Sequence, residues 1–130
     1  MTTFTSDKVK SGKPTRYLET GTWSVSAYYS ASASTSAGDV IQMVNVPAGT
    51  KVVQGWFVPS VTGGFAVGDG LDGDRYIDSG SVVANTVTQF SLLPDYEYSA
   101  DDTIDVLINN AEAAGNYKLT VILAADDPDS

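Results

Sequence analysis

Four aspartates within ten residues are the strongest candidate for chemistry in this sequence. They are Asp69, Asp72, Asp74 and Asp78, in the glycine-rich stretch GDGLDGDRYID. Carboxylate and carbonyl oxygens on a flexible loop are the ligands that Ca²⁺ prefers. However, the spacing is not that of the helix-flanked twelve-residue calcium loop, and glycine and aspartate also favour β-turns for conformational reasons. We therefore interpret the loop as a structural turn and expect no metal or cofactor, with calcium binding as the alternative.

A second acidic group, Asp101 and Asp102 with Glu97 and Asp105 nearby, could form the acid–base pair of a glycosidase. Nothing in the spacing sets a distance between two carboxylates, and paired carboxylates where a strand begins more often form a turn and a charged edge. The chain has no histidine, no cysteine and no G-x-S-x-G motif around a serine, so the usual activated nucleophiles are missing. We therefore expect no enzyme and no catalytic residues.

Short apolar segments separated by turn-forming residues surround these acidic groups, a pattern typical of β proteins. The Pro-Ala-Gly-Thr turn at 47–50 predicts an antiparallel hairpin between its flanking strands, and residues 110–115 predict a second hairpin. Gly55, inside a predicted strand, indicates a bulge or a close contact. The predicted strands cover residues 22–29, 39–46, 51–58, 64–68, 86–92, 103–109 and 116–124.

Seven to nine such strands predict an all-β fold, an antiparallel β-sandwich or a jelly-roll-like arrangement, with the strand order left open. The clearest alternation is at 103–109, where Ile104, Val106 and Ile108 share one face. Asp105 lies on the opposite face of that strand and is expected in solvent. Val106→Asp is therefore expected to unfold the domain, and Asp105→Asn to be nearly silent.

The chain of 130 residues is long enough for one domain. We expect an extended, flexible basic arm at 1–16, a single sandwich domain at 17–124 and an acidic tail at 125–130. The sequence has no apolar run of the length that a signal peptide or a membrane span requires. We therefore expect synthesis in the cytosol and no association with a membrane.

The charge is unevenly distributed along the chain. Lys8, Lys10, Lys13 and Arg16 stand against Asp7 in the first 16 residues, a local charge of +3, which leaves −12 on the remainder of a chain whose net charge is −9. An acidic body should repel nucleic acid, so no nucleic-acid partner is expected. The basic segment is either a solvated terminus or an arm that docks on an acidic partner.

The aromatic residues offer candidates for a contact surface. Tyr28 and Tyr29 are consecutive, so in a regular strand they face opposite sides, and one of them is either exposed or covered by another chain. Trp23 and Trp56 are expected in the core, because a sandwich of this size needs several large apolar side chains. Outward apolar residues could be covered in a homotrimer, although a monomer is equally compatible with the sequence.

Four segments resemble a group of small proteins encoded beside the major capsid gene of tailed bacteriophages: RYLETGTWSVSAYY, GDVIQMVNVPAGTKV, VGDGLDGDRYI and YEYSADDTIDVLI. These proteins are regarded as head decoration (cement) or minor head proteins, and the resemblance covers about residues 15–124. It implies a compact β fold that is made in the host cytoplasm and binds the major capsid protein on the outside of the virion shell, without cofactor or reaction. The acidic loop and the acidic tail depart from the family pattern.

Two other functions remain open. A receptor- or carbohydrate-binding β module could use exposed tyrosines and the acidic loop. A structural protein of the phage tail or neck would need the same rigid scaffold. For the capsid interpretation, the candidates for contact with the shell or with other subunits are Lys8, Lys10, Lys13, Arg16, Tyr28 and Tyr29.

Overall fold

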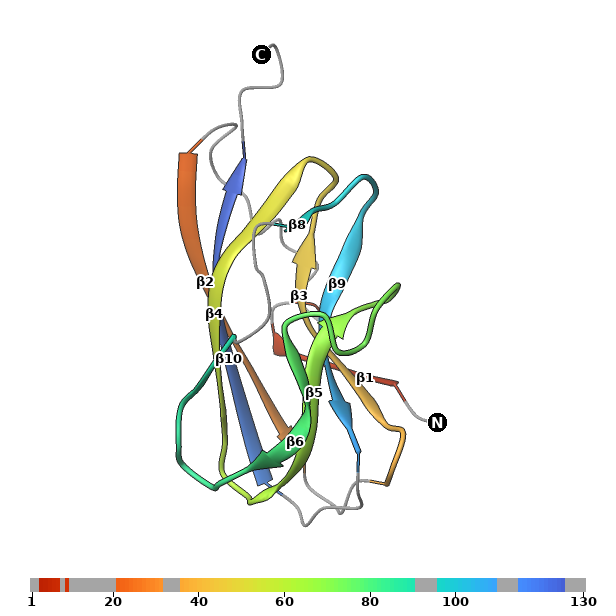
Figure 1. Ribbon diagram of the computed structural model, residues 1–130, viewed down its shortest axis with the longest axis vertical. Coiled ribbons are helices and arrows are strands. Elements are labelled where there is room, and N and C mark those ends of the chain that lie inside the picture. Colours follow the sequence, from red (N-terminus) through yellow and green to blue (C-terminus); the bar gives the residue numbers. More distant parts are fainter. Residues whose placement is uncertain are drawn as a thin grey trace.

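The computed structural model describes residues 3–7, 9, 21–31, 36–90, 96–109 and 115–125. Those residues form two sheets packed face to face, with order β1-β3-β9-β5-β6 in the first sheet and β2-β10-β4-β7 in the second, where β8 also pairs with β4 (Figure 1). The strands are β1 (Thr3–Thr5), β2 (Gly21–Ala31), β3 (Val40–Val46), β4 (Thr50–Pro59), β5 (Gly63–Asp69), β6 (Ile77–Val82), β7 (Thr88–Gln89), β8 (Tyr96–Glu97), β9 (Asp102–Ile108) and β10 (Gly115–Ala125). The all-β prediction is confirmed.

The connections between strands make this sandwich a jelly roll. From β2 to β5 each strand lies in the other sheet from the strand before it, and β9 and β10 are divided in the same way. Strand β10 pairs with β2 and β4, and β9 pairs with β3 and β5, all antiparallel. This is the arrangement of two Greek keys, with β1 added in parallel at the edge of β3.

Both predicted hairpins are wrong. The turn at 47–50 exists, with Gly49 at a φ of 86°, but it carries the chain from β3 in the first sheet to β4 in the second. The strands β9 and β10 are likewise in different sheets. A turn motif specifies a local reversal of direction. Here the flanking strands bury their apolar faces against each other across the sandwich instead of pairing edge to edge.

The core lies between the two sheets and follows the predicted alternation. Ile104, Val106 and Ile108 of β9 are fully buried, and full burial of such a side chain stabilises by about 1.5–3 kcal/mol. Across the sandwich, the inward residues of β10 are Tyr117, Leu119, Val121 and Leu123, all buried. The rings of Phe57 and Phe65 pack against Tyr117.

Residues 3–7 are packed on the sandwich and do not form part of a separate arm. Phe4 in β1 lies 5.5 Å, ring to ring, from Tyr29. The buried hydroxyl of Ser6 donates to the carbonyl of Met43, and Asp7 Oδ1 accepts from the Tyr28 amide at 2.8 Å. The basic residues Lys8, Lys10, Lys13 and Arg16 lie outside the described residues, as do residues 126–130 of the predicted tail.

The segment after the acidic loop departs from prediction. The chain forms an additional strand, β6, at 77–82, and the predicted strand at 86–92 contains the two-residue β7, while its residues 91 and 92 lie outside the described residues. Residues 84–85 turn between β6 and β7, with Asn85 at a φ of 59°. Within the described residues, no helix is long and apolar enough to cross a membrane.

Two predictions in β4 have different outcomes. The close contact at Gly55 is confirmed, because a Cβ there would lie 2.5 Å from the ring of Phe90, and the pairing with β10 slips by one residue at Val53. The prediction of Trp56 in the core is wrong: Trp56 alternates with the buried Phe57 and lies half-buried on the outer face.

The other tryptophan expected in the core, Trp23 in β2, is partly buried and packs against the core.

Candidate functional site

The acidic loop between β5 and β6 is organised around the buried carboxylate of Asp69. Its Oδ1 accepts from the amides of Leu71 and Asp72 at 3.0 and 2.9 Å. Its Oδ2 accepts from Arg75 Nε at 2.6 Å and from the Tyr98 hydroxyl at 2.9 Å. Both oxygens are therefore engaged by the protein itself, and these bonds hold the loop closed.

Two buried tyrosines extend this network into the core. The hydroxyls of Tyr76 and Tyr98 are hydrogen-bonded to each other, and the guanidinium of Arg75 lies 3.7 Å above the ring of Tyr96. Burial raises the pKa of both Tyr76 and Tyr98 above the ordinary value. Tyr98 therefore keeps its proton at neutral pH and can donate it in the hydrogen bond to Asp69.

The loop folds back onto the outer face of the first sheet and covers the strand that carries Asp105. A Cβ on Gly68 would lie 2.1 Å from the carbonyl oxygen of Asp72, and Gly68 is the β5 partner of Asp105. Asp105 is only 7% exposed, so the prediction that it faces solvent is wrong. The acidic loop lies on the outer face of the first sheet, which is the face of β9 that carries Asp105.

The environment of Asp105 disfavours its charged form. Burial raises the pKa of Asp105 to about 7, the hydrogen bond from the Thr103 hydroxyl at 2.6 Å lowers it, and the charges of Asp102 and Asp69 raise it again. The carboxyl group thus titrates near neutrality.

The remaining aspartates of the predicted calcium loop do not form a metal site with Asp69. Hydrogen bonds with Asp72 and Asp78 raise the pKa of Asp74, whereas the hydrogen bond with Asp74 lowers the pKa of Asp72. In the part of the chain that the structure describes, no three potential ligand side chains are arranged to hold a metal ion. The geometry gives Asp69 a conformational role as the centre of the turn.

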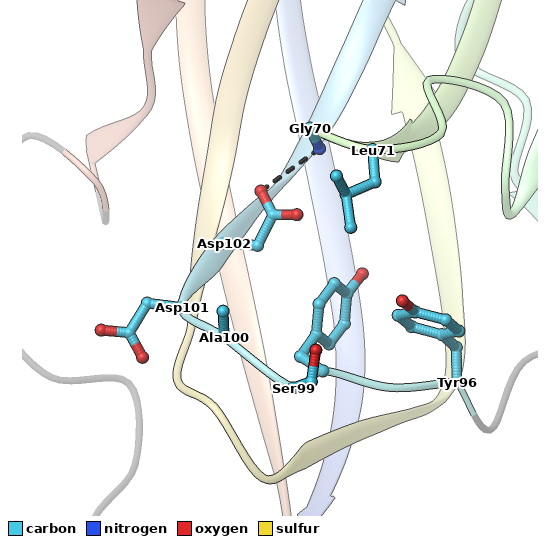
Figure 2. A pocket seen from close by; sticks show the side chains of 8 residues that line it. Gly70, Leu71, Tyr96, Ser99, Ala100, Asp101 and Asp102 are labelled. Atoms are coloured by element: carbon cyan, nitrogen blue, oxygen red, sulfur yellow. Dashed lines mark hydrogen bonds between the residues drawn. The ribbon is translucent and has the colours of Figure 1, made fainter.

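A shallow pocket of about 290 Å³ opens between this loop and the segment that follows β8 (Figure 2). Leu71, 79% exposed, projects from the loop toward that segment. Asp102 Oδ1 accepts from the amides of Gly70 and Thr103 at 3.2 and 2.7 Å. Asp101 points away from the pocket and accepts from the Ala48 amide at 2.9 Å. Both carboxylates therefore fix backbone turns and are not paired for acid–base chemistry.

The second candidate surface is the outer face of the sheet formed by β2, β10 and β4. Tyr28 is 51% exposed on this face, whereas Tyr29 packs against the core, so the prediction that they face opposite sides is confirmed. The ammonium of Lys118 lies 5.5 Å from the centre of the Tyr28 ring. The hydroxyls of Ser26 and Thr120 are 2.9 Å apart in the next cross-strand row, which continues to Trp56.

A second shallow pocket, also about 290 Å³, lies at one end of this outer face. Its lining residues are Tyr28, Val58, Pro59, Ser60, Asn85, Asn116, Tyr117 and Lys118. The sequence pattern indicated Tyr28 and an outward Lys118, but it could not indicate Asn85, which comes from the connection between β6 and β7. The backbone amide of Asn85 donates to the carbonyl of Pro59 at 2.8 Å and so holds this connection against the end of β4.

No protein-family model and no curated protein matches the chain. Its fold is similar to a chain in the cyanophage Pam1 capsid asymmetric unit, with a TM-score of 0.73 and 14% identity over 88% of this chain and 91% of that one. A chain in the capsid of Ralstonia phage GP4 gives a TM-score of 0.71 and 15% identity over 95% and 98%. A chain in the acidic stable capsid structure of Helicobacter pylori bacteriophage KHP30 gives 0.54 and 18% over 80% and 93%.

Proposed function

We propose that this protein is a structural component of a bacteriophage capsid, and that it binds the outside of the assembled head as a decoration (cement) protein. The observation that carries the proposal is the similarity in fold to chains of the Pam1 and GP4 capsid structures. In each comparison the similarity covers nearly all of this chain and of the matched chain. The likeness therefore extends over most of each pair of chains and is not confined to one part of the fold. The sequence resemblance to decoration proteins supports the finer role.

The site geometry supports adhesion in place of catalysis. The described carboxylates that could have formed an acid–base pair, Asp101 and Asp102, accept hydrogen bonds from backbone amides. The acidic loop is held closed by its own side chains. A rigid body with fixed surfaces can stabilise a shell because it binds the assembled state and not the dissociated subunits.

The partner in this proposal is the major capsid protein, and copies of the chain could also contact one another as a trimer on the shell. The protein would then reside on the capsid surface of the virion. Lys8, Lys10, Lys13 and Arg16 would anchor on an acidic part of the shell, while the body, with a charge of −12 beyond residue 16, remains soluble.

The test uses heads of the phage that encodes this chain, assembled without it. Purified full-length protein should bind these heads at saturable, regularly spaced positions in electron micrographs and raise the temperature at which they release DNA. Density confined to the tail or neck would contradict the proposal. Failure to bind heads, together with binding to one sugar on a glycan array, would favour the carbohydrate-binding alternative.

The basic segment has its own prediction. Replacing Lys8, Lys10, Lys13 and Arg16 together by Gln should weaken binding to the heads by about tenfold at low salt and make it less sensitive to added salt, because screened charge pairs supply that part of the affinity. Deleting residues 1–16 is a poorer experiment, since it also removes β1 and the buried Ser6. Unchanged affinity and salt dependence in the Gln variant would contradict the anchoring role.

A further inference from the structure

The outer face of the second sheet differs in charge from the rest of the molecule. The strands β2, β4, β7 and β10 contain no aspartate or glutamate, and their charged side chains are Lys51 and Lys118. The short strand β8, which also pairs with β4, places the exposed Glu97 opposite Lys51, at the end of β4 away from Tyr28. The described acidic residues lie on the first sheet, in its connecting loops, on β8 and in the segment after it, apart from Asp7, which binds the edge of β2. In a protein with a net charge of −9, this face can meet a neutral or acidic surface without like-charge repulsion.

Most of the large exposed apolar side chains in the described ranges lie on or beside the second sheet. The described ranges contain five large exposed ones, of which Tyr28 and Val53 lie on the strands of this sheet. Val83 and Val87 border it in the connection from β6 to β7, which swings around to β4 (Figure 1). Leu71, on the acidic loop, is the fifth. Four of the five therefore lie on or next to this sheet, and exposed apolar side chains are common where a protein contacts a partner.

The pocket at the end of this face supplies a feature that a flat sheet lacks. Tyr28 and Lys118 line it from the sheet, and Asn85 lines it from the connection. Asn85 has a φ of 59°, in the left-handed region that asparagine adopts more readily than most residues other than glycine, and the hydrogen bond from its backbone amide to the carbonyl of Pro59 holds it there. The pocket, with the Lys118 cation beside the Tyr28 ring, is a place where a partner's side chain could insert.

We infer that the outer face of β2, β10 and β4, with the pocket at Tyr28, Lys118 and Asn85, is the surface that docks on the capsid shell. This inference rests on the proposed function. The partner surface is a neutral to acidic protein surface that places a carboxylate near Lys118 and uncharged atoms over Ser26, Thr120 and Trp56. The acidic loop and the outer face of the first sheet then remain in solvent.

The experiment measures binding of labelled full-length variants to the same protein-free heads by co-sedimentation. Tyr28→Glu and Lys118→Glu each place a negative charge on the proposed docking face. Leu71→Glu is the matched control, because it adds the same side chain at a highly exposed position on the acidic loop. Each docking-face variant should weaken binding by about tenfold or more, while the control stays within about twofold. The melting temperature of each variant shows that it folds.

The outcomes separate the two proposals. If the unmodified protein does not bind heads, the proposed function fails and this inference fails with it. If the unmodified protein binds and only Leu71→Glu weakens binding, the acidic side docks, and this inference is overturned while the function stands. Equal binding by all three variants would also overturn it, because docking would then depend on other surfaces such as the basic segment.

Discussion

At the scale of single residues, Asp105 links the stability of the fold to pH. Its pKa in the folded protein is about 7, against an ordinary value of 3.8. Between these pH values the folded state keeps a proton that the unfolded state has lost. The contribution of Asp105 to stability is therefore most favourable below about pH 4, falls as the pH rises through this window and levels off above about pH 7.

The prediction that follows concerns Asp105→Asn. The amide removes the buried charge and keeps an acceptor for the Thr103 hydroxyl, so the variant should be more stable than the natural protein at pH 8 by about 2–4 kcal/mol. At pH 4 the difference should nearly vanish. Chemical denaturation at the two pH values measures it. A gain in stability of the same size at both pH values would contradict the raised pKa of Asp105.

At the scale of elements, β1 and the two residues after it close one side of the sandwich. Strand β1 covers the edge of β3, while Asp7 binds an amide on the edge of β2. Uncovered strand edges promote pairing with other chains. This segment therefore protects two edges at once, although it contributes only three residues to a sheet.

Ser6 is the residue on which this closure depends most. Its buried hydroxyl donates to the Met43 carbonyl and accepts from the Val9 amide at 3.3 Å. Ser6→Ala should lower the free energy of unfolding by about 1–2 kcal/mol, because the buried carbonyl loses its donor. Thr5→Ala, at an exposed neighbouring position, is the control and should stay within about 0.5 kcal/mol. Equal stability of the two variants would show that the hydroxyl contributes nothing.

At the scale of the whole molecule, the jelly roll separates two surfaces of different character. The first sheet and its loops carry most of the described carboxylates, including the closed turn around Asp69. The second sheet presents hydroxyls, Tyr28, Trp56 and Lys118 on its outer face. Such a division suits a protein that adheres by one side and stays soluble through the other.

The alternation of apolar residues determined the fold class and the core. Side chains in a strand point to opposite faces with a period of two, so Ile104, Val106 and Ile108 could be placed in the core, and Tyr28 and Tyr29 on opposite faces, from local spacing alone. The turn at 47–50, with its left-handed Gly49, was recognisable for the same reason.

Only the tertiary structure decided which strands pair, what covers their outer faces and which connection completes a pocket. The burial of Asp105 depends on a loop that returns from β5, and the position of Asn85 depends on where the chain crosses to β4. These contacts join residues far apart in sequence, and the local pattern of residues carries no record of them. Trp56 was misplaced because either face of a half-buried strand can accept a large aromatic side chain.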